Sequence, residues 1–228
     1  MKTSNKLLLT ILGVLVGSLL TYDIALKAEY RTGSYKDEFR DFKALVITGF
    51  DEVQVTDPNV NVKLTPGKFG VRINKHSAEY IQVKQVGRRL VVTANFPRTS
   101  EGGVRMSSRG DNTVLISCPD LRAFTTAGAW AEVSGFALDS LTVRQDRQSE
   151  VEMAGNKIGY LRATAGLSPG SECTLKITQA NQIQAADLAI QNKSELVVEN
   201  VFIPKLTCQF SDSASASISG RALGMMQR

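Results

Sequence analysis

Apolar residues return about every 20 residues through the second half of this chain, and this repeat restricts its fold more than any other feature. The first register consists of Leu121, Leu141, Leu161, Ile183 and Leu206. The second consists of Val133, Met153, Leu175, Val198 and Ile218. A unit of this length is too small to bury its own apolar face, so successive units must stack on one another. The spacing therefore predicts coils that share one core.

Each repeat contains two short stretches in which apolar and polar residues alternate, as in VEMAG at 151–155. Alternation with period two is typical of β-strands, and the repeat leaves no room for a helix. Glycine recurs after the second stretch, at Gly135, Gly155 and Gly220, where it permits a tight corner. The pattern predicts an all-β fold, a single-stranded right-handed parallel β-helix (solenoid).

Further residues agree with this interpretation. Asn200 takes the corner position in the fourth coil, and asparagine tolerates left-handed backbone well. Cys208 shares the inward register, and with Cys118 and Cys173 it is interpreted as a small buried residue, because the number is odd and no CxxC spacing occurs. The alternative fold is an antiparallel sandwich or barrel. That fold needs tight hairpins, for which the turn at Gly87 is the best candidate.

The amino terminus is a targeting segment. Lys2 and Lys6 precede an apolar run from Leu7 to Leu20, and no small-residue cleavage pattern follows it. This favours an uncleaved signal-anchor, a transmembrane helix that tethers the chain; a cleaved signal peptide and a buried core helix are the alternatives. The basic residues favour a cytoplasmic amino terminus, with the rest exported to the periplasmic side of the inner membrane. The expected divisions are 1–28 for the anchor, 29–43 for a membrane-proximal linker and 44–228 for the β-helix domain.

Three segments resemble a known family. VLISCPDL at 114–121, TTAGAWAEVSG at 125–135 and YIQVKQVGRRLVV at 80–92 are similar to the putative auto-transporter adhesin head domain called the GIN domain. The resemblance is one of spacing and covers nearly the whole chain. It implies a β-helix in the bacterial cell envelope with no established enzymatic activity, and it brings no binding residues with it.

Basic residues on the outward face of the first strand are the first binding candidates. Arg122 and Arg162 are expected in register two coils apart, with Arg144 at the neighbouring outward position. Such a strip would contact an anion or a glycan, or it is simply a solvated outer face. The net charge of +5 is spread along the chain and indicates no nucleic-acid partner.

The second strand is expected to carry the opposite sign. Its aligned acidic residues are Glu132, Glu150, Glu152, Glu172 and Glu195. Such a column would bind a cation such as Ca²⁺ or serve solubility alone. Trp130, the only tryptophan, is expected outward beside Glu150, either as a sugar-stacking platform or beneath the polar loop at 96–112. His76 is the only histidine, so the sequence supports neither a histidine metal site nor a Ser-His-Asp triad, and no cofactor motif occurs.

The carboxyl end has two interpretations. Leu223, Met225 and Met226 form either a plug for the open end of the solenoid or part of an edge that pairs with another chain. We therefore expect a non-enzymatic, membrane-tethered module that binds a glycan or an envelope protein. An envelope scaffold or signalling partner that self-associates through a solenoid end is the alternative. A polysaccharide-active enzyme of β-helix type, with a cleft beneath the 96–112 loop, is the second alternative.

Overall fold

The computed structural model describes residues 3–32, 39–58, 60–96 and 113–225. The chain divides into two compact units, Met1–Phe42 and Lys43–Arg228. The first contains the helix α1 (Thr3–Thr32). Within it, Lys6–Ala28 has a mean hydropathy of 2.0 and no buried residue, so it is long and apolar enough to cross a membrane.

The second unit is a parallel β-solenoid of about five turns, as the sequence predicts. The eight-stranded sheet runs in the spatial order β16 (Lys205–Phe210), β14 (Gln182–Ile190), β12 (Lys157–Ala165), β10 (Ala137–Asp146), β8 (Ala123–Ala127), β2 (Glu52–Val55), β6 (Arg89–Ala94) and β5 (Ile81–Val86). The nine-stranded sheet runs in the order β1 (Phe42–Leu45), β4 (Gly70–Asn74), β7 (Val114–Cys118), β3 (Asn61–Pro66), β9 (Trp130–Ser134), β11 (Glu150–Ala154), β13 (Thr174–Ile177), β15 (Glu195–Glu199) and β17 (Ser215–Ser219). A 3-10 helix, η2 (Gly220–Met225), follows β17.

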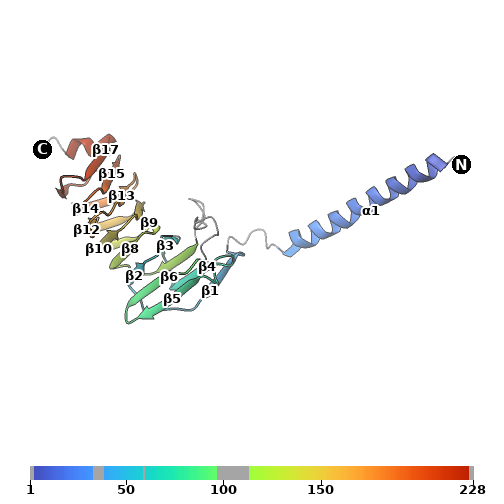
Figure 1. Cartoon of the computed structure of the whole chain (residues 1–228), viewed down its shortest axis with the longest axis horizontal. Helices are drawn as coiled ribbons and strands as arrows, with labels where there is room; N and C mark the ends of the chain where they lie inside the picture. The colour runs from blue at the N-terminus through green and yellow to red at the C-terminus, as the bar shows by residue number, and fades with distance from the viewer. Residues whose placement is uncertain (1–2, 33–38, 59, 97–112, 226–228) are drawn as a thin grey trace. The chain divides into compact units, whose positions relative to one another are not determined.

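Inward side chains from both sheets form one core, because alternate residues of each strand are buried. Stacked coils place equivalent side chains in columns. One column contains Val133, Met153 and Ile177, which pair across β9, β11 and β13 and are fully buried. Figure 1 shows the coils following one another in chain order from β8 to β17. The apolar register of the sequence thus corresponds to the inner wall of the solenoid.

The first coil departs from simple chain order. The strand β2 lies between β6 and β8 and is parallel to both. In the other sheet, β3 lies between β7 and β9 and is parallel to both. Beyond them the sheets turn antiparallel, since β4 pairs with β7 and β5 with β6. The β5–β6 hairpin turns at Gly87, whose φ is 61°, so the best hairpin candidate in the sequence marks a real turn at the edge of a parallel fold.

Three register assignments from the sequence are wrong. Leu161 pairs with Ala186 rather than Ile183, and Met153 pairs with Ile177 rather than Leu175. The reason is an insertion: β12 is joined to β13 through residues 166–173, whereas β10 is joined to β11 through only 147–149. A constant spacing does not allow for the longer coil.

The third error is at Leu121. Val143 pairs with Phe124, which leaves Leu121 out of step with Leu141. Leu121 and Phe124 are both buried, so the period-two alternation breaks between them and β8 begins only at Ala123. The inward positions of β8 are therefore Phe124 and Thr126, and Ala123 lies on its other face. Cys208 pairs with Leu188 and packs, half-buried, against the core, in agreement with its inward register.

Left-handed residues form the corners, as predicted. Gly135, Gly155 and Gly220 have φ between 61° and 78°, and Asn200 has a φ of 55°. In the lengthened third coil the left-handed residue is Ala180, with a φ of 75°.

Candidate binding surfaces

A shallow depression of about 290 Å³ on the eight-stranded sheet gathers three arginines. Arg89 comes from β6, Arg122 immediately precedes β8 and Arg144 lies on β10. Sequence reasoning selected Arg122 and Arg144 but missed Arg89, because β6 belongs to the coil that is displaced from chain order. The remaining lining is mostly polar and includes Glu52 and the hydroxyl-bearing residues Thr125, Ser140 and Thr142.

Arg122 is held by a buried carboxylate. Asp51 is 3% exposed and accepts hydrogen bonds from Arg88 Nε at 3.0 Å and Arg88 Nη2 at 2.6 Å. The Nη1 of Arg122 lies 3.5 Å from the same carboxylate. These hydrogen bonds from Arg88, together with the two positive charges, hold the pKa of Asp51 below its ordinary value despite the cost of burial. Arg122 is thus positioned at the rim of the depression.

Arg89 is also paired, with Glu52 Oε2 at 3.0 Å. Arg144 differs from both: among the described residues its guanidinium has no ion pair. Its strand neighbours are Thr125 and Thr164. In the depression, the positive charges of Arg89 and Arg122 are therefore partly neutralised by carboxylates, whereas that of Arg144 is not.

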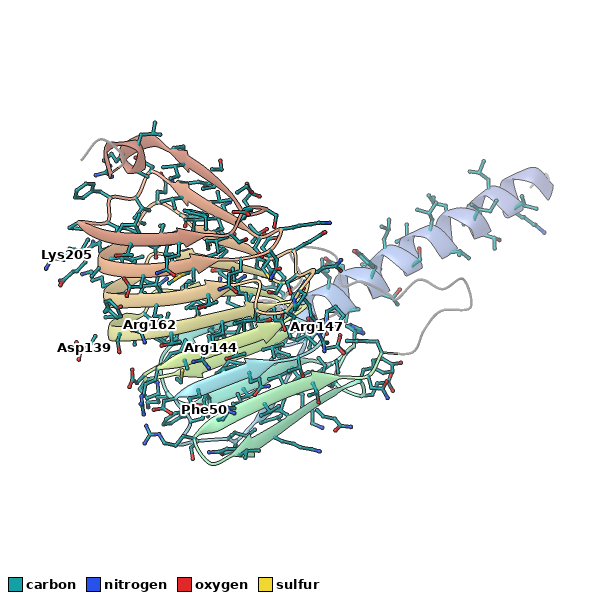
Figure 2. All side chains as sticks on the ribbon, turned by 60° about the vertical axis from the view of Figure 1, so that its left-hand side comes forward. Phe50, Asp139, Arg144, Arg147, Arg162 and Lys205 are labelled. Atoms are coloured by element: carbon teal, nitrogen blue, oxygen red, sulfur yellow. The ribbon has the colours of Figure 1, made fainter. Side chains whose placement is uncertain are left out.

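Arg162 is exposed on β12 and lies outside this depression. Figure 2 shows Arg144 and Arg162 on neighbouring strands of one sheet. Arg162 pairs with Thr142, which pairs with Ala123, so the predicted register of Arg162 with Arg122 is wrong by one residue. The break in alternation before β8 is the cause.

The guanidinium of Arg162 packs over the ring of Tyr160 at 5.7 Å from its centroid. The Tyr160 hydroxyl donates a short hydrogen bond to Asp187. A hydrogen bond with the Tyr160 hydroxyl raises the pKa of Arg162 above its ordinary value. These contacts join Arg162 to Tyr160 and Asp187 in one surface cluster.

Trp130 lies on the other sheet. It is half-buried on β9 and pairs with Asn61 and Glu150. Its pairing with Glu150 agrees with the sequence prediction, and the arginines lie on the opposite, eight-stranded sheet. The loop at 96–112 was expected to cover Trp130 or to form an enzymatic cleft, and all of it except Phe96 lies outside the described residues.

The predicted acidic column is interrupted. Glu132 and Glu152 do pair, but Lys63 and Lys176 flank them. Lys63 Nζ lies 3.0 Å from Glu132 Oε1. In the neighbouring column the partner of Glu150 is Thr174, not Glu172. Across the described residues, no group of three or more histidine, cysteine or acidic side chains could hold a metal ion.

The remaining carboxylates have separate structural positions. Asp146 accepts hydrogen bonds from Ser168, Ser171 and the Arg147 amide, and these contacts lower its pKa to about 2. Asp139 lies in a second hollow, a groove of about 850 Å³ that crosses successive coils and also contains Lys157 and the 44% exposed Phe202. Burial raises the pKa of Cys118 to about 12, so this thiol is not poised as a nucleophile.

No family model matches the chain, and no curated protein matches it. Among solved structures it is similar to a putative adhesin from Parabacteroides distasonis, with 14% identity, coverage of 78% of this chain and 80% of that chain, and a TM-score of 0.44. A putative adhesin from Bacteroides fragilis is 12% identical, with coverages of 78% and 96% and a TM-score of 0.40. A putative lipid binding protein from Parabacteroides distasonis is 12% identical, with coverages of 78% and 94% and a TM-score of 0.30. Likenesses this distant carry no functional argument, and the similarity to the GIN domain stays a resemblance.

Proposed function

We propose that this chain is a non-enzymatic binding module, exported and tethered to the membrane by α1, that binds acidic glycans through the arginine-lined depression. The observation that carries this proposal is the convergence of Arg89, Arg122 and Arg144 on one polar surface. Guanidinium groups recognise carboxylate and sulfate oxygens through paired N–H donors. The hydroxyls of Thr125 and Thr142 add partners for sugar hydroxyls.

The distribution of charge supports a saccharide acid over a larger polyanion. Arg89 and Arg122 are already partly neutralised by Glu52 and Asp51, so the net positive charge of the depression is small. A nucleic acid needs a continuous basic face, whereas a single carboxylate or sulfate group needs one free guanidinium. Arg144 is that group, and the two paired arginines orient the ligand beside it.

The same pairing argues against acid–base catalysis at this surface. Glu52 is the carboxylate that lines the depression, and it is held by Arg89 at 3.0 Å. A general acid or base must reach the reacting bond with a matched pKa. Glu52 instead serves to position a guanidinium, which is what a binding site requires.

The test is calorimetric titration of the full chain in detergent with hexagalacturonate, using uncharged maltohexaose as the control ligand. We expect hexagalacturonate alone to bind, and its affinity to fall as salt rises because exposed charge pairs are screened. Arg144→Ala should weaken this binding at least fivefold. The matched control is Lys157→Ala, which removes a positive charge from the groove that contains Asp139 and Phe202 and should leave the affinity unchanged.

Absence of hexagalacturonate binding by the parent chain would contradict the proposal. Equal affinities for the parent and Arg144→Ala would do the same, because binding would then lie elsewhere.

The tether is tested separately. We propose that α1 stays attached and that residues 44–228 lie on the exported side of the inner membrane, behind a linker at 29–43. The support is the unburied apolar span Lys6–Ala28. A mature protein of 24.8 kDa recovered from membranes is the expected result of mass measurement. A shorter mature chain that begins after the span would contradict it.

A further inference from the structure

The solenoid is closed differently at its two ends. At one end the antiparallel strands β4 and β5 lie beyond the last parallel pairs. At the other end, among the strands that the structure describes, β16 and β17 are the outermost of their sheets and each pairs on one side only. The 3-10 helix η2 buries Ala222 and contacts β15 and β17, but Leu223, expected as a plug, is 51% exposed. The other two expected plug residues, Met225 and Met226, are outside what can be described for their side chains.

Core columns are consequently open at the last coil. Phe210 continues the column of Ala165 and Ile190, which are fully buried, yet Phe210 itself is 45% exposed. Ala216 continues the column of the buried Leu196 and is also exposed. The residues of this open end that belong to core columns are Leu206, Cys208, Phe210, Ala216 and Ile218.

The two edge strands carry few of the features that normally prevent edge pairing, and those that β16 has are confined to its beginning, at Pro204 and Lys205. Exposed edges are usually protected by charged residues, proline or bulges. The strand β17 reads SASIS, and β16 reads KLTCQF, with one charge at its first residue, Lys205. The rest of β16 and the whole of β17 are uncharged, and such edges beside open apolar columns match a second end of the same composition.

We propose that this open end is a dimer interface, occupied by the open end of a second copy of the chain. A two-fold axis that crosses an edge strand pairs that strand with its own copy in the antiparallel direction. Since β16 and β17 are the two sides of one coil, a single axis serves both. Each sheet then continues from one chain into the next, and the open core columns of the two chains meet.

The burial pattern restricts the register, and we propose one of the registers that satisfy it. Residues that pair directly across antiparallel strands lie on the same face, so inward residues must face inward residues. In β16 this condition is met when Cys208 lies opposite the partner's Cys208, which places Leu206 opposite the partner's Phe210. In β17 the centre is Ser217, with Ala216 opposite the partner's Ile218. Lys205 then faces the partner's Ser211, so no like charges are opposed.

The first test measures mass. The full chain in detergent, analysed by light scattering that separates protein from detergent mass, should form dimers of the 24.8 kDa chain. Ala216→Lys should convert it to a monomer, because each introduced ammonium group would be buried opposite the partner's Ile218 without a counter-charge. Ser213→Lys places the same charge on the exposed turn of the same coil and should remain dimeric.

The second test measures the register. Mild oxidation of the dimer should give a disulfide-linked chain pair through Cys208, because pairing brings the two thiols together. Cys208→Ser should stay dimeric by mass and lose the cross-link. A monomeric parent chain, a dimer that survives Ala216→Lys, or a cross-link that persists in Cys208→Ser would each overturn the proposal. The acidic-glycan site is tested at Arg144, so the two proposals fail independently.

Discussion

Asn156 Nδ2 donates a hydrogen bond of 3.0 Å to Asn181 Oδ1, one coil further along the solenoid. Asn156 is fully buried, and its side chain also accepts from the Phe136 amide and donates to the Val133 carbonyl. Two buried asparagines thus satisfy main-chain groups at corners where the strands stop pairing. Buried main-chain groups without a partner are costly, so these side chains complete the coils.

Replacement of Asn156 by Ala should therefore destabilise the domain by about 3 kcal/mol, because the Phe136 amide and the Val133 carbonyl would lose partners inside the protein. Urea denaturation measures the free energy of unfolding. The control is Gln184→Ala, an exposed residue of β14 that should change it by less than about 0.5 kcal/mol. A similar small effect at both positions would show that the hydrogen bonds of Asn156 contribute nothing to the free energy of unfolding.

A second prediction compares adjacent arginines. Arg88 pairs with Asp51, whose side chain is 4% exposed, whereas Arg89 pairs with Glu52, whose side chain is 32% exposed. Arg88→Ala should cost about 2–3 kcal/mol, because it leaves a buried carboxylate poorly compensated. Arg89→Ala should cost less than about 1 kcal/mol, as exposed ion pairs do. Thermal unfolding at neutral pH ranks the two variants, and equal losses would contradict the assignment.

The sequence predicted the solenoid well and its charges poorly, for a physical reason. Inward residues such as Val143 and Met153 must be apolar in every coil because they are buried, so their repeat is visible in the sequence. The depression depends instead on Arg89 of β6, which lines the same surface as Arg122 across the intervening strand β2. No local pattern records that arrangement. Likewise, the break in alternation before β8 shifted Arg122 by one residue, which period-two reasoning could not detect.

The third prediction concerns acid stability. Hydrogen bonds from Ser171 and Ser168 lower the pKa of Asp146 from 3.8 to about 2, despite the opposing cost of desolvation. A carboxylate with a lower pKa in the folded state stabilises the fold above its unfolded pKa, and this contribution disappears as pH falls through the folded value. The loss should therefore occur between about pH 4 and pH 2.

Asp146→Asn should lower stability at pH 7 by about 1–2 kcal/mol, since it weakens charge-assisted hydrogen bonds to the inserted segment 166–173. It should also flatten the decline of stability between pH 4 and pH 2. Unfolding measured across this range tests both effects. Asp139→Asn removes an exposed carboxylate of the same strand, β10, and should keep the steep decline. A decline in Asp146→Asn as steep as that of the parent would contradict the assignment.

The last prediction separates backbone strain from steric conflict at two corner glycines. Gly155 has a φ of 65°, and a Cβ added there would meet nothing within 4 Å. Gly166 has a φ of 85°, but its added Cβ would lie 2.2 Å from the Gln191 carbonyl oxygen and 2.6 Å from Ser194 Oγ. Both positions impose the cost of a left-handed backbone on alanine, about 1 kcal/mol. Only Gly166 adds an overlap with main-chain atoms of the next coil.

Gly155→Ala should accordingly cost about 1 kcal/mol, and Gly166→Ala about 3–4 kcal/mol, because the coils would have to move apart at that corner. Urea denaturation measures the free energy of unfolding of each variant. The backbone strain is common to both and cancels, so the difference between them reports the steric overlap. Equal costs would mean that the segment around Gly166 moves to make room for a side chain, so that the stacking of coils does not restrict this position. The larger loss at Gly166 would instead show that close coil stacking requires a residue without a side chain there.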